Sequence, residues 1–176
     1  VSTSSSSQVS GLSKYDLNQP IGWSNVGGKV TGSEDKNPVL VSTMSQFLEA
    51  MKGTEQRTIY VSGTLTTNAQ VYVQNAANKT VYGLPGSALA NTTHTSNANN
   101  TGVLCIKNCK NIILRNLTFK GPGAYDIDGK DNLTMQKSTY VWVDHCDFQD
   151  GCDGNFDINT ASDNISITWC RFRYLI

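Results

Sequence analysis

Three stretches of this chain share one pattern: IILRNLTF (Ile112–Phe119), VWVDHCDF (Val141–Phe148) and ISITWCRF (Ile165–Phe172). When they are aligned, the first, third, sixth and eighth positions are apolar in all three: Ile112, Leu114, Leu117 and Phe119; Val141, Val143, Cys146 and Phe148; Ile165, Ile167, Cys170 and Phe172. At the chain's hydrophobic content of 38%, such complete agreement would arise by chance roughly once in 100,000 trials. The three stretches are therefore an internal repeat.

The repeat has a period of 29 and then 24 residues. A second short strand pattern precedes each stretch, in VLCIK from Val103, LTMQK from Leu133 and FDINT from Phe156, and no helical pattern lies between them. Periods of this size indicate a solenoid, and periods made only of strands indicate a parallel β-helix. Each coil of such a fold stacks about 4.8 Å above the last, so equivalent residues form ladders.

The alternation of apolar and polar residues changes parity inside each stretch, so the chain must bend around the fourth and fifth positions. The fifth position is occupied by Asn116, His145 and Trp169. Asparagine tolerates the left-handed backbone conformation that a tight bend needs. We therefore expect His145 to lie at a structural corner between neighbouring coils. This interpretation is favoured over the alternative that Asp144 and His145 form a catalytic dyad.

One helix is predicted before the repeats, in TMSQFLEAMKG (residues 43–53). Thr43 followed by Gln46 is a capping-box signature, and Gly53 is typical of a helix end. Apolar residues recur there at helical spacing: Met44, Phe47, Leu48 and Met51. After the helix, RTIYVSGTL (residues 57–65) is the first predicted strand.

The charge balance and the hydropathy of the chain argue against some classes of function. The chain has 176 residues, and 14 Lys and Arg balance 14 Asp and Glu, so bulk charge does not indicate nucleic-acid binding. Without an apolar run of about 18 residues or the pattern of a signal peptide, the sequence predicts a soluble chain that does not bind membranes. The serine-rich residues 1–10 are predicted to be a flexible tail, and residues 11–176 are predicted to belong to a single domain.

The five cysteines include no CxxC pair, which argues against a zinc site. Most are expected to be small buried hydrophobic residues. Cys146 and Cys170 share one ladder position, and the sequence leaves open whether they are bonded or only stacked.

Three aspartates are the candidates for cation binding. Asp153 and Asp157 lie in DGNFD, where Phe156 and Ile158 alternate toward the core, so Asp157 should point outward. Asp131 lies two residues before the equivalent strand of the coil below, so the three carboxylates could converge on a hard cation such as calcium. From spacing alone, solvated aspartates in turns remain the alternative.

Four stretches make the chain resemble the pectate lyases of polysaccharide lyase family 1: RTIYVSGTL, TVYGLPGSAL, DNLTMQKSTYVWVDHCDF and DGNFDINTASDNISITWCRF. The resemblance implies a right-handed parallel β-helix with an N-terminal capping helix, and a secreted enzyme. It implies cleavage of polygalacturonate by β-elimination, with calcium bridging enzyme and substrate carboxylates. By motif match, Asp131, Asp153 and Asp157 fall on calcium-ligand positions, and Asp128 is either a further ligand or a turn residue.

The chain departs from the family pattern after the ITWCRF strand. In the family, the arginine base and a substrate-binding lysine lie on later coils, whereas here the sequence ends at Ile176. Arg171 and Arg173 do not match the base motif, and Arg171 is expected to be a solvated surface residue. We therefore expect this chain to be the N-terminal portion of an incomplete solenoid, held to a remaining C-terminal segment.

Three alternative functions remain at this point. A galacturonan hydrolase of the same fold would use paired aspartates as acid and base, but further Asp and His motifs on neighbouring coils are missing. A pectin lyase acts without calcium and has no use for three clustered aspartates. A non-catalytic β-helix that binds polysaccharide is the third alternative, and the missing base makes it compatible with this chain.

Overall fold

The computed structural model describes residues 19–124 and 127–176. The predicted serine-rich tail, residues 1–10, lies outside this part of the chain.

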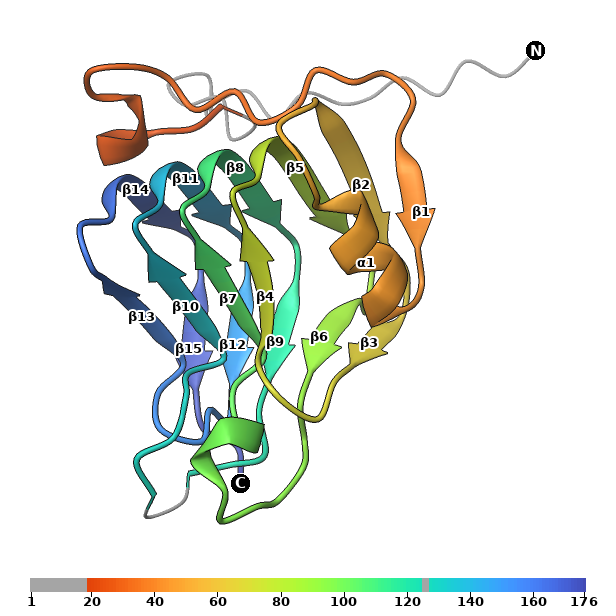
Figure 1. Cartoon of the computed structure of the whole chain (residues 1–176), viewed down its shortest axis with the longest axis vertical. Coiled ribbons are helices and arrows are strands. Elements are labelled where there is room, and N and C mark those ends of the chain that lie inside the picture. Colours follow the sequence, from red (N-terminus) through yellow and green to blue (C-terminus); the bar gives the residue numbers. More distant parts are fainter. Residues whose placement is uncertain (1–18, 125–126) are drawn as a thin grey trace, which may run out of the picture.

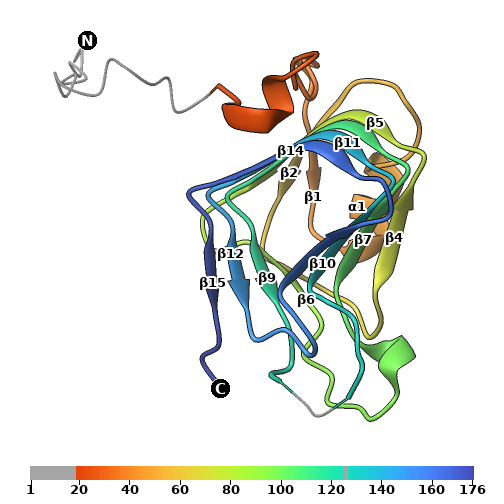
Figure 2. The same ribbon diagram turned by 90° about the vertical axis from the view of Figure 1, so that its left-hand side faces the viewer.

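Three parallel sheets surround one core (Figures 1 and 2). In spatial order, sheet A contains β1 (Val39–Val41), β2 (Arg57–Val61), β5 (Ala77–Gly83), β8 (Lys110–Arg115), β11 (Thr139–Asp144) and β14 (Asp163–Thr168). Sheet B contains β3 (Thr64–Thr66), β6 (Ala88–Ala90), β9 (Thr118–Lys120), β12 (Asp147–Gln149) and β15 (Arg171–Arg173). Sheet C contains β4 (Val71–Gln74), β7 (Leu104–Lys107), β10 (Leu133–Gln136) and β13 (Phe156–Asn159). Successive strands thus alternate among the sheets, which confirms the predicted parallel β-helix.

The register of the sheets confirms the sequence repeat. Val141 pairs with Ile112 on one side and Ile165 on the other, at the equivalent position of each coil. In sheet B, Phe148 pairs in the same way with Phe119 and Phe172. The stretches aligned by their apolar residues are therefore stacked directly on one another.

The predicted corner is present in all three coils. Asn116, His145 and Trp169 have φ angles of 57°, 50° and 53°. These values lie in the left-handed region, which non-glycine residues occupy rarely. The corner turns the chain from sheet A into sheet B.

Aromatic rings stack along the core behind sheet B. The ring centroid of Phe148 lies 4.8 Å from that of Phe119 and 4.9 Å from that of Phe172, with interplanar angles of 8° and 4°. Aromatic pairs contribute about 0.5–1.5 kcal/mol beyond the burial of their surface. This ladder therefore stabilises the coils relative to one another.

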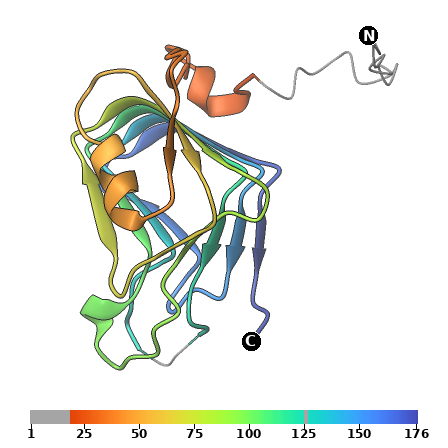
Figure 3. The ribbon, with the colours of Figure 1, turned by 90° about the vertical axis from the view of Figure 1, so that its right-hand side faces the viewer.

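The helix α1 (Met44–Ala50) covers the N-terminal end of the coils (Figure 3). Its capping box forms as predicted, because the Thr43 side chain accepts from Gln46 N and the Gln46 side chain accepts from Thr43 N. Phe47 is fully buried in the main core. The helix pattern in the sequence thus predicted the capping element correctly.

The first strand predicted after the helix is present, but it is shorter than the sequence pattern suggested. RTIYVSGTL forms two strands, β2 and β3, separated at Gly63, which has a φ of 75°. The short strand β1 precedes the helix and pairs with β2. Three residues are too few to display a clear alternation of apolar and polar side chains.

At the other end, β13, β14 and β15 form the last coil (Figure 2). Its inward-facing residues Ile158, Ile167 and Phe172 are 41%, 40% and 50% exposed. The coils before it bury the equivalent residues Met135, Val143 and Phe148 completely.

A segment before β1 crosses the outer face of sheet A (Figure 1). It begins with the 3-10 helix η1 (Gly22–Asn25). Val30 packs in a small second core against Ile113 and Trp142, and Trp23 Nε1 donates to Asp163 Oδ1 at 2.7 Å. This segment explains why large apolar residues point outward from the centre of sheet A.

Candidate functional site

A row of residues in register, one from each strand, lies on the outer face of sheet C. Tyr72, Cys105, Thr134 and Asp157 are in register on β4, β7, β10 and β13. On β10 the two neighbours of Thr134 belong to the core. Asp157 therefore points away from the core, as the alternation in the sequence predicted.

Asp131 and Asp153 lie next to this ladder, just before β10 and β13. Partial burial, followed by the negative charges of Asp157 and Asp153, raises the pKa of Asp131 to about 6. Asp131 Oδ1 lies beside Gly154, which stands between Asp153 and Asp157 in the next coil, so the three predicted carboxylates come from neighbouring parts of sheet C. Asp128 is exposed in the loop between β9 and β10.

Gly154 leaves space for the Asp131 carboxylate. A Cβ at this position would lie 2.1 Å from Asp131 Oδ1, so any larger residue would force the Asp131 carboxylate to move. The glycine in DGNFD thus leaves room for a side chain of the neighbouring coil, which spacing along the chain does not reveal.

The carboxylate oxygens of Asp131, Asp153 and Asp157 are suitable ligands for calcium, but the three side chains do not point toward a common centre. Within the described residues, no three Asp, Glu, His or Cys side chains converge closely enough to hold a metal ion. Asp157 Oδ2 instead accepts from Asn159 Nδ2 at 2.5 Å, and Asp153 is exposed. Carboxylate oxygens are the ligands that calcium prefers, and a bound cation would offset the repulsion at Asp131. Binding would require the three side chains to turn toward one another.

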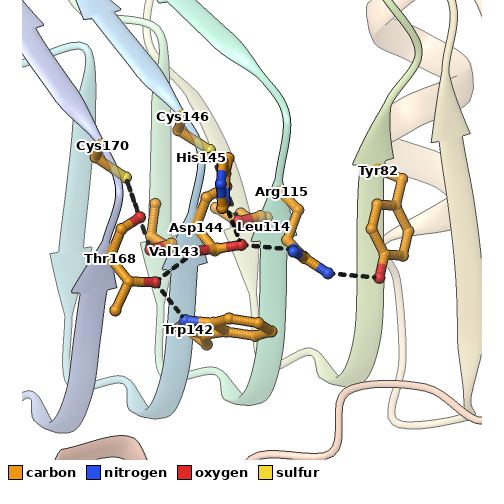
Figure 4. A network of polar contacts seen from close by, with 10 residues as sticks. All are labelled: Tyr82, Leu114, Arg115, Trp142, Val143, Asp144, His145, Cys146, Thr168 and Cys170. Atoms are coloured by element: carbon orange, nitrogen blue, oxygen red, sulfur yellow. Dashed lines mark hydrogen bonds and ion pairs between the residues drawn. The ribbon is translucent and has the colours of Figure 1, made fainter. Parts of the chain in front are cut away.

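A second group of polar residues lies on the outer side of sheet A, at its corner with sheet B (Figure 4). Asp144 has a completely buried side chain. Its carboxylate accepts from Arg115 Nε at 2.7 Å and from Thr168 Oγ1 at 2.5 Å. Thr168 Oγ1 in turn accepts from Trp142 Nε1 at 2.8 Å, and Arg115 Nη1 donates to Tyr82 Oη at 3.3 Å. The network links four consecutive coils.

The Asp144 and His145 side chains also meet, with 2.7 Å between Asp144 Oδ2 and His145 Nδ1. This is the contact that a catalytic dyad would need. However, the same carboxylate already neutralises Arg115, and the backbone of His145 forms the corner. The geometry therefore favours the structural role that the repeat predicted. The partners of Asp144 were missed, although Arg115 and Thr168 occupy the fourth position of the other two repeats and pair with Asp144 in sheet A.

Arg171 is exposed as expected, but it is not free. Its Nη2 lies 2.9 Å from Asp147 Oδ2, and Arg173 Nη2 lies 2.5 Å from the same oxygen. Both arginines thus pair with a carboxylate on the outer side of sheet B. They lie away from the aspartates of sheet C.

The cysteines behave largely as the sequence predicted. Cys105, Cys109, Cys146 and Cys152 are buried, Cys170 is partly buried, and all five are free thiols. Cys146 and Cys170 occupy adjacent coils, where Arg171 N donates to Cys146 O at 2.9 Å. In this structure they are stacked without being bonded.

A family model described as pectate lyase matches residues 14–174. The chain belongs to the pectate lyase family. Among curated relatives, it is 33% identical over 157 residues to a protein of Aspergillus terreus named probable pectate lyase B, covering 85% of this chain and 43% of that protein. It is 27% identical over 175 residues to the pectate trisaccharide-lyase of Thermotoga maritima, covering 93% of this chain and 45% of that protein. The chain thus spans less than half the length of these pectate lyases.

Solved pectate lyases have the same fold. A variant of the Bacillus subtilis pectate lyase aligns with a TM-score of 0.66 and 16% identity, covering 87% of this chain and 58% of that one. The pectate lyase of Paenibacillus sp. 0602 aligns with a TM-score of 0.64 and 18% identity, covering 86% and 41%. Over residues 19–124 and 127–176, the chain has no helix with the length and apolar character needed to span a membrane.

Proposed function

We propose that this chain is the N-terminal portion of a secreted, calcium-dependent pectate lyase, which cleaves polygalacturonate, the de-esterified form of pectin, by β-elimination. Family membership supports the reaction class. The observation that carries the calcium assignment is the position of the carboxylates: Asp157 faces outward on β13, and Asp131 Oδ1 lies against Gly154, the residue that follows Asp153. Secretion is part of the proposal, because a polymeric substrate of this kind must be reached outside the cell.

The three aspartates fit the chemistry of this reaction. Removal of the C5 proton from a galacturonate unit places negative charge on the adjacent carboxyl group. Calcium held by Asp131, Asp153 and Asp157 would neutralise that charge when bound. Without a cation, the same three carboxylates would repel the anionic substrate.

The proposal assigns the catalytic base to coils beyond Ile176. The exposed core residues of the last coil, Ile158, Ile167 and Phe172, support this division of the protein, because solenoid ends normally need a cover. We infer that the remaining C-terminal segment packs on β13, β14 and β15. Intact mass measured under native and denaturing conditions tests this. A monodisperse, stably folded 19.1 kDa chain without a partner segment would contradict the inference.

The absorbance of the unsaturated product tests the function, using the complete protein with its C-terminal segment and polygalacturonate, with calcium or with a chelator. We expect product only when calcium is present. Calcium-independent product from methyl-esterified substrate would indicate a pectin lyase, whereas new reducing ends without the absorbance would indicate a hydrolase. Binding of polygalacturonate without any product would indicate the non-catalytic module.

Calcium should raise the melting temperature, because it relieves the repulsion among the three carboxylates. Calcium at 100 times its Kd is expected to stabilise the fold by about 2.7 kcal/mol. Thermal unfolding in calcium and in chelator measures this. Magnesium is the control cation, because its smaller, stricter octahedral site fits these three side chains less well. An equal shift with both ions would contradict a calcium-selective site.

Substitution of His145 distinguishes the corner from a catalytic dyad. His145→Asn should retain activity within about twofold, because asparagine tolerates the left-handed conformation. His145→Val should lower the free energy of unfolding by about 1–2 kcal/mol more than His145→Asn. Chemical unfolding and product absorbance measure the two effects. Loss of activity in a stable His145→Asn variant would support the dyad instead.

A further inference from the structure

The coils before the carboxylates carry a second group of exposed residues on the outer face of sheet C. Tyr72 on β4 is 44% exposed, although its neighbours Val71 and Val73 pack in the core. One coil further, Cys105 occupies the same ladder position and is only 1% exposed. Larger side chains therefore cover Cys105, and it forms the floor of this part of the face.

Two lysines, one on β7 and one before β10, lie next to Cys105 and Tyr72 in this part of sheet C. Lys107 is exposed on β7, two residues after Cys105, and Lys130 directly precedes Asp131. Burial raises the pKa of Cys105 to about 11, while the positive charges of Lys107 and Lys130 oppose the shift. Because Cys105 and Lys107 are two positions apart on β7, Lys107 shares the outer face of the strand with the thiol.

Lys130 also contacts the aromatic ring. Its Nζ donates to Tyr72 Oη at 3.5 Å and lies 5.8 Å from the ring centroid. The Lys130 backbone is held in place, because its N–H donates to Thr101 Oγ1 at 2.8 Å. The backbone thus positions a flexible ammonium group beside an exposed aromatic face.

We propose that Tyr72, Lys107 and Lys130 form a uronate subsite, which binds a galacturonate unit next to the one at the carboxylate cluster. The inference rests on the proposed function. A tyrosine face can pack against the apolar side of a sugar ring, and ammonium groups pair with carboxylates. Thr134 separates Cys105 from Asp157 on the ladder, so the cationic group and the carboxylates lie on neighbouring coils. An anionic polymer could thus contact both groups at once.

The opposite arrangement of charges gives the two groups different tasks. The carboxylates can bind the polymer only through a cation, whereas Lys107 and Lys130 can pair with it directly. Exposed ammonium groups also attract a polyanion over a distance of about 8–10 Å in ordinary buffers. The lysines are therefore expected to contribute to substrate binding and orientation, and not to the chemical step.

Lys110 and Tyr140 provide a matched contrast elsewhere on the surface. Lys110 Nζ lies 5.4 Å from the Tyr140 ring centroid, on sheet A. The Tyr140 hydroxyl is engaged, because it donates to Gly27 O at 3.0 Å in the segment before β1. This lysine and tyrosine are therefore held against the segment before β1. Lys110→Gln is the control for the loss of a surface lysine that lies near a tyrosine but outside the proposed subsite.

The test compares Lys107→Gln, Lys130→Gln and Lys110→Gln in the complete protein. With polygalacturonate as substrate, the first two variants should raise KM about tenfold each and leave kcat within about twofold of the parent. Calcium affinity, measured by titration, should stay unchanged. Added salt should reduce the difference between parent and variants, because exposed charges are screened. Tyr72→Phe should retain the parent KM, whereas Tyr72→Ala should raise it.

Three results would overturn the subsite. These are an unchanged KM in Lys107→Gln and Lys130→Gln, an equal effect of Lys110→Gln, or a loss of calcium affinity that accounts for the change. If the parent protein forms no unsaturated product, the proposed function fails separately. In that case, titration with trigalacturonate in the presence of a chelator decides the subsite. Weaker binding by the first two variants would support it, and equal binding would refute it.

Discussion

Replacing Asp144 by Ala is expected to lower the free energy of unfolding by about 3–5 kcal/mol. The Asp144 side chain is fully buried, and that of Arg115 is only 10% exposed. The substitution would remove the carboxylate that Arg115 Nε contacts at 2.7 Å inside the protein. It would also remove the acceptor for Thr168 Oγ1 and the partner of His145. Chemical unfolding followed by circular dichroism measures the loss.

Asp147→Ala is the matched control. Asp147 occupies β12 and also contacts two arginines. Its own side chain is 12% exposed, but the side chains of Arg171 and Arg173 are 68% and 37% exposed. Water can therefore solvate both guanidinium groups once the carboxylate is removed, so Asp147→Ala should be less destabilised than Asp144→Ala. If the two variants lose equal free energy of unfolding, burial of the arginine partner does not explain the effect of Asp144→Ala.

A double substitution separates the ion pair from its burial. Replacing Arg115 and Asp144 together by Met and Leu should cost less than Asp144→Ala alone, because it leaves no buried charge without a partner. A larger loss in the double variant would indicate that the charges themselves stabilise the stack of coils.

Asp157→Asn is expected to lower kcat/KM for polygalacturonate by on the order of 100-fold or more. The substitution keeps the size of the side chain and the outward orientation on β13, but removes one anionic ligand from the proposed calcium site. The calcium concentration for half-maximal activity should rise in parallel. Product absorbance over a calcium titration measures both effects. Stability in the presence of a chelator should not fall, because the change also removes repulsion on Asp131.

Two controls define the effect of Asp157→Asn. Glu49→Gln removes a carboxylate that is 72% exposed on α1, and it should leave activity unchanged. Asp128→Asn tests the remaining candidate ligand, and full activity would identify Asp128 as a turn residue. Parent-like activity of Asp157→Asn at low calcium would refute the assignment of Asp157 to the metal site.

The sequence predicted the architecture because a parallel β-helix repeats it. Each coil buries apolar residues at equivalent positions, so the alignment of Ile112, Val141 and Ile165 in the sequence is the pairing in sheet A. The corner at His145 followed from the parity change in the same pattern. The strand β1 was missed because three residues carry too little pattern.

Side-chain contacts between coils could be predicted only in part. The repeat aligns Asp144 with Arg115, but the burial of the pair and its hydrogen bond arise from the stacking of coils about one strand spacing apart. The space at Gly154 for Asp131 has the same origin. Neither contact has a fixed sequence separation, because the loops between strands differ in length from one coil to the next.

By itself, the sequence determined the all-β coil, the helix that covers its first end and the residues that fill its core, because these depend on local alternation repeated many times. Only the tertiary structure decided which polar residues act together. It separated the Asp144 network on sheet A from Asp131, Asp153 and Asp157 on sheet C, and it placed Lys130 beside the Tyr72 ring. The physical reason is that burial and charge interactions depend on distance in space, which the stacking of coils sets.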